Sequence, residues 1–190
     1  MIVEQITEAL ATKIYNMGFI SRCGSVAQEV RRENGSIPSA TIAPFSGENK
    51  PVSMVPDHKE TGVCWFEVSA SRVIRQTSRV MSLQNEWRLV TWINGTRFSM
   101  DDILAAELTA MQAVRGARFA ADEDGPLRGV TIQYQGADMA GPGVFARWAF
   151  DEQENLLTLP PYRAAAHRFL ITYIVATSCL PQLAVTAPAC

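Results

Sequence analysis

The stretch from Trp87 to Val114 constrains the fold more than any other part of this chain. It opens with apolar and aromatic residues at strand density and reaches Asn94-Gly95, a dipeptide typical of tight turns with positive φ. Ser99 is a predicted helix N-cap, followed by Asp101 and Asp102 where the helix dipole favours negative charge. Four apolar residues then recur at helical spacing and predict one apolar stripe: Ile103, Leu104, Leu108 and Met111. This strand, turn and helix predict the seed of an α+β core.

The totals fit one globular domain over residues 1–190, with 47% hydrophobic and 19% charged residues. A formal charge of -2 provides no general field that attracts nucleic acid or anionic lipid. The first ten residues lack the basic start of a signal peptide, and no apolar run reaches the length of a membrane span. We therefore expect a protein made and folded in a cytoplasm, with no membrane partner.

Periodicity predicts two helices and about five or six strands. An amphipathic helix is expected over residues 2–17, with Gly18 as its C′ residue, and a second helix follows Ser99. Residues 75–85 are polar and predict a long hairpin loop. The expected strands are 63–74, the segment opening at Trp87, 130–134, 144–150 and 169–179. Residues 19–23 and 156–159 are candidates for short strands, while 26–32 fits either a helical turn or an edge strand. The fold class predicted is α+β: a largely antiparallel sheet with both helices on one face.

Two segments depart from this regular pattern. Residues 34–62 contain repeated Pro and Gly, which predict a long projecting loop or arm; a surface loop without a role is the alternative. Residues 181–190 are expected to be a frayed C-terminal tail.

The residue pattern contains no recognisable catalytic, cofactor or metal motif. The four cysteines are scattered, with no CxxC pair, so we expect reduced thiols, with Cys64 and Cys179 buried in strands. A Cys64–His167 pair is the one nucleophile–base combination considered, and no signature supports it. The acidic clusters fit helix capping or solvated turns. Four tryptophans fall in predicted strands and indicate core packing: Trp65, Trp87, Trp92 and Trp148.

Charged residues suggest a surface function instead. If strand 63–74 pairs with the strand opening at Trp87, four arginines gather near one end of the hairpin: Arg72, Arg75, Arg79 and Arg88. A solvated face, a protein interface and contact with a nucleic-acid backbone are all compatible with such a cluster.

The order of the elements resembles the tail terminator and tail-completion proteins of long-tailed bacteriophages. Three stretches carry the resemblance: the leading helix with MGF at 17–19, the segment LVTWINGTRF…DDILAAELTAM, and the ending LTLPPYRAAAHRFLITYIVATSC. The resemblance is one of architecture, since none of these stretches is a sequence-specific motif. The chain is longer than many such proteins, and residues 34–62 are the expected insertion.

The resemblance implies a virion protein without enzymatic activity or cofactor, assembled in the host cytoplasm. Such a subunit closes into a ring, usually of six copies, which caps the tail tube and joins it to the neck on the head side. Tail-tube and neck proteins are the implied partners, and the ring lumen is the candidate passage for DNA. The position in the particle stays open among tail terminator, neck ring and another tail-associated protein.

Ring closure requires two different complementary patches on each subunit. We expect Arg75, Arg79 and Arg88 to meet acidic residues of an adjacent copy. The expected interface residues are Arg72, Arg75, Arg79, Arg88, Asp122, Glu123 and Asp124. The alternative is a small ligand-binding or enzymatic α+β domain with a pocket lined by Trp65, Trp92 or Trp148.

Overall fold

The computed structural model describes residues 2–31, 38–42, 52–53, 56–119, 129–138, 142–145 and 159–176. Its largest unit is a six-stranded sheet in the order β1-β5-β7-β9-β8, with β6 pairing β7 on the same edge as β5. These strands are β1 (Arg22–Val26), β5 (Gly62–Val68), β6 (Arg72–Gln76), β7 (Val80–Ile93), β8 (Thr131–Asp138) and β9 (Arg163–Ala176). Only β1 and β5 run parallel; every other pairing in this sheet is antiparallel.

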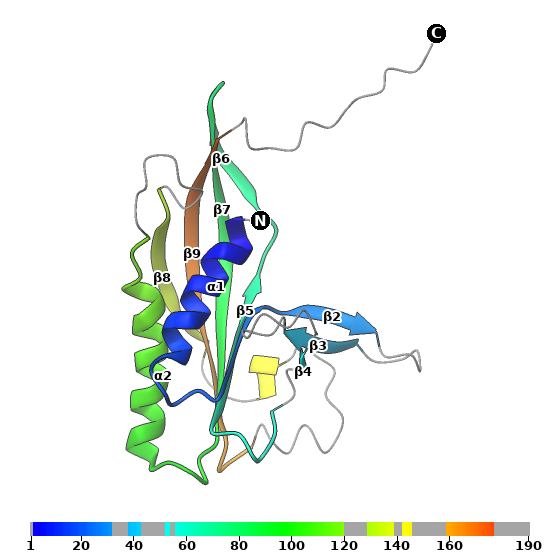
Figure 1. Cartoon of the computed structure of the whole chain (residues 1–190), viewed down its shortest axis with the longest axis vertical. Coiled ribbons are helices and arrows are strands. Elements are labelled where there is room, and N and C mark those ends of the chain that lie inside the picture. Colours follow the sequence, from blue (N-terminus) through cyan, green and yellow to red (C-terminus); the bar gives the residue numbers. More distant parts are fainter. Residues whose placement is uncertain are drawn as a thin grey trace.

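The strands β7 and β9 form the long axis of the molecule (Figure 1). All 14 residues of β7 pair in register with the 14 residues of β9, from Val80 opposite Ala176 to Ile93 opposite Arg163. On the other edge of β7, β5 covers the half that ends at Ile93, and β6 covers the half that begins at Val80. The sheet is thus organised around one uninterrupted ladder.

Helices α1 (Ile2–Tyr15) and α2 (Met100–Arg115) lie side by side on one face of the sheet (Figure 1). Ile6, Leu10 and Ile14 of α1 are buried against residues of β5, β7 and β9, such as Phe66 and Phe169. The prediction of an α+β fold with a largely antiparallel sheet of about six strands and two helices is confirmed.

The C-terminal end of α1 and the N-terminal end of α2 carry the predicted terminal residues. Gly18 has φ +82° just beyond the end of α1, a conformation that residues with a Cβ rarely adopt. Ser99 is the N-cap of α2, and its hydroxyl oxygen accepts a hydrogen bond from the Asp102 backbone N–H.

The apolar stripe predicted for α2 was partly wrong. Ile103 and Met111 are buried, whereas Leu104 and Leu108 are exposed on the outer side of the helix. Small residues take the inward positions, and Glu107 is buried among them. The spacing i, i+4 of Leu104 and Leu108 marks a second, outward-facing row that the sequence pattern alone does not separate from the inner one.

The segment 34–62 is more regular than predicted. It contains β3 (Pro38–Ile42) and β4 (Val52–Ser53), which form a three-stranded antiparallel sheet with β2 (Gln28–Arg31). Of the two alternatives left open for 26–32, residues 28–31 form an edge strand and not a helical turn. This small sheet projects sideways from the large one (Figure 1).

The central hairpin differs from the prediction in two ways. The expected strand 63–74 is divided into β5 and β6, because the Asn85 side chain hydrogen-bonds the Ser69 carbonyl and the Ser71 hydroxyl at the break. The expected loop 75–85 is mostly strand, since β7 already begins at Val80. Polar side chains suit this part of β7, where most positions are only partly buried.

The remaining strands are confirmed in part. The strand predicted at 130–134 is β8, and the final strand is β9, which begins earlier than predicted and lies between β7 and β8. Instead of a fourth strand at Val144, residues 142–145 form a short 3-10 helix, η1 (Pro142–Phe145). Residues 146–158 and 177–190 lie outside the described part of the chain, including the predicted tail.

A second core covers the opposite face of the sheet. Val144 and Phe145 of η1 pack against Trp65, Trp92 and neighbouring small residues of β9. The ring of Phe145 lies 5.7 Å from that of Trp65, and Tyr162 stacks on Trp92 at 5.2 Å. Both faces of the central strands therefore carry aromatic side chains.

Asn94-Gly95 does not form the expected positive-φ turn. The glycines with positive φ are Gly18, Gly129 and Gly136, and no other residue type among the described residues has positive φ. Gly95 is required for another reason: a Cβ added there would lie 1.9 Å from the Pro161 carbonyl oxygen. The backbone entering α2 thus touches the turn that precedes β9.

We predict that Gly95→Ala lowers the free energy of unfolding by about 2–3 kcal/mol, because the added methyl group overlaps backbone atoms that cannot move independently. Gly116→Ala is the matched control, since its added Cβ would lie no closer than 3.1 Å to a neighbouring atom and its φ is -89°. The control should change stability by less than about 1 kcal/mol. Chemical denaturation measures both, and equal stabilities of the two variants would contradict the close approach.

Candidate functional site

The tip of the β6–β7 hairpin is exposed and well defined. The turn that joins the strands is closed by backbone hydrogen bonding from Thr77 to Val80, and the Thr77 hydroxyl oxygen accepts from the N–H groups of Arg79 and Val80. All five residues of β6 are exposed. The exposed fractions of Val73 and Ile74 are 49% and 47%. We call the following residues the hairpin patch: Arg72, Val73, Ile74, Arg75, Arg79 and Val80.

Three of the four predicted arginines belong to this patch, and Arg88 does not. Its guanidinium lies 3.1 Å from the Glu67 carboxylate and donates to the Val144 carbonyl oxygen at 3.0 Å. It is nine positions from Arg79 along the chain, roughly 30 Å at strand rise. The expectation that Arg88 gathers with the other arginines was wrong, because β7 begins seven residues before Trp87 and carries Arg88 away from the tip. Asp122, Glu123 and Asp124 lie outside the described residues.

The outer side of α2 carries a second exposed apolar row. Met100, Leu104 and Leu108 follow one another at four-residue spacing, with exposed fractions of 69%, 46% and 40%. Asp101 and Asp102 are exposed in the same first turn. We call these five residues the α2 ridge. The sequence pattern assigned Leu104 and Leu108 to the core, because an outward apolar row has the same spacing as an inward one.

A polar cluster joins α2 to β9 beneath the helices. One carboxylate oxygen of Glu107 accepts from Arg163 Nε at 2.5 Å, and the other lies 3.5 Å from His167 Nε2. The second contact is long and makes no hydrogen bond of good geometry, so Arg163 is the firmer partner. Nδ1 of His167 lies 3.3 Å from the Tyr134 hydroxyl.

Burial opposes ionisation of Glu107, but the nearby His167 and the hydrogen bond and charge of Arg163 outweigh it and lower the pKa of Glu107. The arrangement resembles an acid–base pair, yet His167 is 2% exposed. No residue of this cluster lines the hollow described next. The Glu107 cluster therefore orients α2 on the sheet.

A hollow of about 500 Å³ lies over the central strands β5, β7, β8 and β9. Its charged lining residues are Glu67, Glu86, Arg88 and Arg168. Glu67 also accepts from Trp65 Nε1 at 3.4 Å, so its carboxylate is held by two neighbours. Neither histidine nor cysteine lines this hollow, and its paired charges fit a polar contact surface better than a nucleophilic site.

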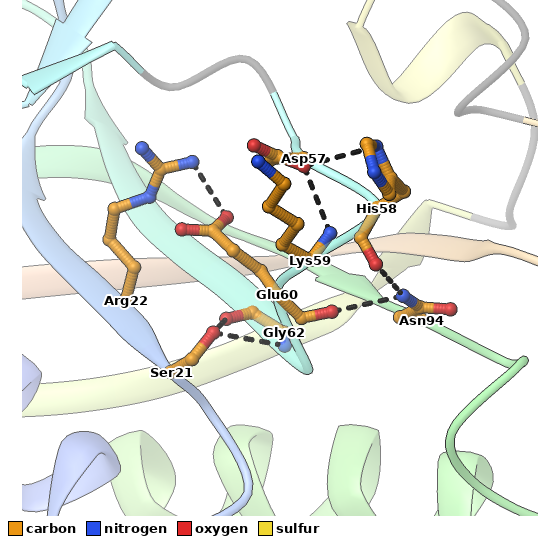
Figure 2. A network of polar contacts seen from close by, with 8 residues as sticks. All are labelled: Ser21, Arg22, Asp57, His58, Lys59, Glu60, Gly62 and Asn94. Carbon is orange, nitrogen blue, oxygen red and sulfur yellow. Dashed lines mark hydrogen bonds and ion pairs between the residues drawn. The ribbon is translucent and has the colours of Figure 1, made fainter.

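The segment around His58 is fixed by Asn94 (Figure 2). The buried Asn94 side chain donates to the carbonyl oxygens of His58 and Glu60 at 2.9 and 3.0 Å. Asn94 therefore joins the end of β7 to the entry of β5. The His58 ring is exposed, and its Nδ1 lies 3.1 Å from Asp57.

Arg22 and Glu60 meet at 2.7 Å in the same network (Figure 2). Burial raises the pKa of Glu60, although the charge and hydrogen bond of Arg22 partly offset it. The Lys59 backbone N–H donates to Asp57 and lowers the pKa of its carboxyl group. These contacts tie β1 to the segment before β5.

The structure does not bring together the other residues considered for catalysis. Cys64 lies on β5 and His167 on β9, with β7 between them. Trp65 and Trp92 are buried in the core and do not line the hollow, whereas Trp87 lies at its wall; Trp148 is outside the described part of the chain. Within the described ranges, no group of three or more His, Cys, Asp or Glu residues is placed to hold a metal ion.

We predict that Glu107→Gln lowers the free energy of unfolding at pH 7 by about 2 kcal/mol, because Arg163 loses a charge-assisted hydrogen bond. Since the folded state lowers the pKa of Glu107, the ionised carboxylate stabilises the protein above the ordinary pKa of glutamate. That contribution is lost as the pH falls through the folded pKa. The difference between wild type and Glu107→Gln should therefore shrink on acidification.

Thermal or chemical unfolding measured from pH 7 to pH 3 checks this expectation. Glu8→Gln, at an exposed position on the outer side of α1, is the matched control and should have little effect across the range. Glu60 has a raised pKa, so its contribution to stability changes with pH in the opposite direction to that of Glu107. Because Glu60 is present in all three proteins, this contribution cancels in the comparison. A difference independent of pH would contradict an ionised Glu107.

Comparison with protein-family models and with curated protein sequences found no match to this chain. Among the described residues, neither helix combines the length and apolar character needed to cross a membrane.

Proposed function

We propose that this chain is a structural subunit that closes into a ring, of the kind that terminates a bacteriophage tail tube and joins it to the neck. The observation that carries the proposal is the presence of two unlike exposed patches on one subunit, one on the β6–β7 hairpin and one on α2. The hairpin patch combines Val and Ile with three arginines, and the α2 ridge combines Met and Leu with two aspartates.

The two patches suit a head-to-tail contact between copies. They lie on different sides of the molecule, with α2 beside β8 and β6 on the other side of β7 (Figure 1). A ring requires two different surfaces that complement each other, because each subunit uses one towards each neighbour. Basic and apolar groups on one patch match acidic and apolar groups on the other, which favours pairing of unlike over like patches.

Both patches are held in place before any contact forms. The hairpin tip is closed by the Thr77 hydrogen bonds and continues the β7–β9 ladder. The α2 ridge lies on a capped helix that the Glu107 cluster joins to β9. Surfaces ordered in advance lose little conformational freedom on binding, which supports an assembly role.

The proposed place of the ring in a virion rests on the resemblance in element order to tail terminator and tail-completion proteins. The leading helix, the hairpin, the second helix over the sheet and the closing strands are the elements that carry this resemblance. On this proposal six copies cap the tube, tail-tube and neck proteins are the partners, and DNA passes through the lumen. The small sheet of β2, β3 and β4 is available for contact with a neighbour.

One observation favours a second function, the binding of a small polar ligand. The hollow over β5, β7, β8 and β9 is large enough for such a molecule and contains two arginines and two glutamates. Against this function, Arg88 is already held by Glu67 and by the Val144 carbonyl. A monomer with a ligand in this hollow would support the second function over the first.

We predict that Ile74→Asp in the hairpin patch, and Leu104→Glu with Leu108→Glu in the α2 ridge, each weaken self-association about 30-fold or more. Each variant places an acidic group in an apolar contact and should be monomeric at concentrations where the wild type forms a ring. Mixing the two variants should give a heterodimer, because one intact hairpin patch then meets one intact α2 ridge. Native mass spectrometry measures all four samples.

Formation of the heterodimer distinguishes pairing of unlike patches from pairing of like patches. If the patches pair with their own kind instead, each variant alone will form homodimers through its intact patch, and mixing will change nothing. Gln133→Glu, at an exposed position of β8 away from both patches, is the control and should assemble like the wild type. A wild type that stays monomeric at high concentration would contradict the ring.

A further inference from the structure

Two cysteines face each other beneath the helices. Cys23 on β1 and Cys64 on β5 are direct partners in the register of these parallel strands. Their side chains are 2% and 0% exposed, and their Sγ atoms lie 2.6 Å apart. Adjacent strands place Cα atoms within the range that a disulfide spans. Neither the Glu107 cluster nor the hollow uses these two residues.

Among the described residues, the surroundings of the pair do not provide a metal site. Reaction between the two sulfur atoms is the chemistry that remains. Within the described ranges, no third His, Cys, Asp or Glu joins the two sulfurs in a potential ligand set. The neighbours are apolar, and both cysteines belong to the core formed by α1, α2 and the sheet. Two thiols placed in contact and shielded from other partners are arranged for reaction with each other.

We propose that Cys23 and Cys64 form a reversible disulfide that fastens β1, and α1 before it, to the central sheet when the protein meets a low-molecular-weight disulfide such as oxidised glutathione. One cysteine thiolate attacks the glutathione disulfide and releases one glutathione thiolate, giving a mixed disulfide. The second cysteine, as thiolate, attacks the protein sulfur of that bond and releases the other glutathione. Two protein thiols are oxidised, two glutathione thiols are formed, and the two cysteine protons end on them.

Reaction requires β1 to open. Burial, together with the hydrogen bond and charge of Cys23, raises the pKa of the Cys64 thiol well above its usual value, so the closed form is unreactive. β1 is the edge strand of the sheet and pairs there with β5 alone. Separation of this edge strand exposes both thiols at once, whereas closure returns them to contact. The reaction is therefore slow in the folded protein and fast during folding.

The linkage has a physical consequence because the cysteines are distant in the sequence. They are 41 positions apart, so the bond closes a long loop of the unfolded chain. Restricting the unfolded state in this way raises the thermal midpoint, here by about 10 °C for a loop and a chain of this size. The proposal does not depend on ring formation, and its test is independent of assembly.

The test uses the full chain with Cys179→Ser and Cys190→Ser, which leaves only the two cysteines in question. One sample is incubated folded with oxidised glutathione, and another is refolded from denaturant in its presence. Each is quenched with acid, unfolded and treated with a maleimide. The expected product has no reactive thiol, a mass lower than the reduced form by two hydrogen atoms, and a tryptic cross-link between peptides 23–31 and 60–72.

Cys23→Ala in the same background distinguishes a paired from an independent thiol. It should retain one glutathione adduct or one maleimide-reactive group, and its thermal midpoint should not change with the oxidant. Two free thiols, or two glutathione adducts, in both the folded and the refolded samples would overturn the proposal. A disulfide that leaves the thermal midpoint unchanged would overturn the claim that it fastens β1 to the sheet.

Discussion

The continuous ladder between β7 and β9 is the interaction on which the rest of the structure depends. It runs for 14 residue pairs, roughly 45 Å at about 3.4 Å per residue. Near Ile93 it carries the aromatic cores on both faces; near Val80 it continues past them to support the hairpin tip. The same two strands therefore build the core and hold the hairpin patch outside it.

Local features of this architecture could be predicted from the sequence. The periodicity of α1, its Gly18 terminus, the Ser99 cap of α2 and the apolar β9 depend on residues close together in the chain. The apolar residues of β9 fit its observed place between β7 and β8 in the sheet. These elements sufficed for the fold class, since two helices and several strands with apolar faces leave few layered arrangements.

The sequence pattern did not reveal the features that depend on contacts between segments distant in the chain. The polar start of β7 is a strand because β6 and β9 pair with its two edges, and its composition alone indicated a loop. Leu104 and Leu108 were assigned to the core because an outward apolar row has the same spacing as an inward one. The contact of Cys23 with Cys64 depends on a parallel pairing across 41 positions, for which no local signal exists. Three arginines of the candidate interface were identified correctly as exposed, but Arg88 was not, because its partner Glu67 lies on another strand.

Buried ion pairs on the two faces of the sheet fix the positions of the layers that pack against it. Glu107 with Arg163 sets α2 on the helix face, and Glu67 with Arg88 and the Val144 carbonyl sets η1 on the other. Buried ion pairs contribute little net stability compared with apolar groups, but a shifted layer would leave a charge unpaired, which costs several kcal/mol. Each layer therefore has one preferred position on the ladder. A subunit that closes a ring needs this property more than a large stability, because the angle between its two contact surfaces decides whether the chain of copies closes.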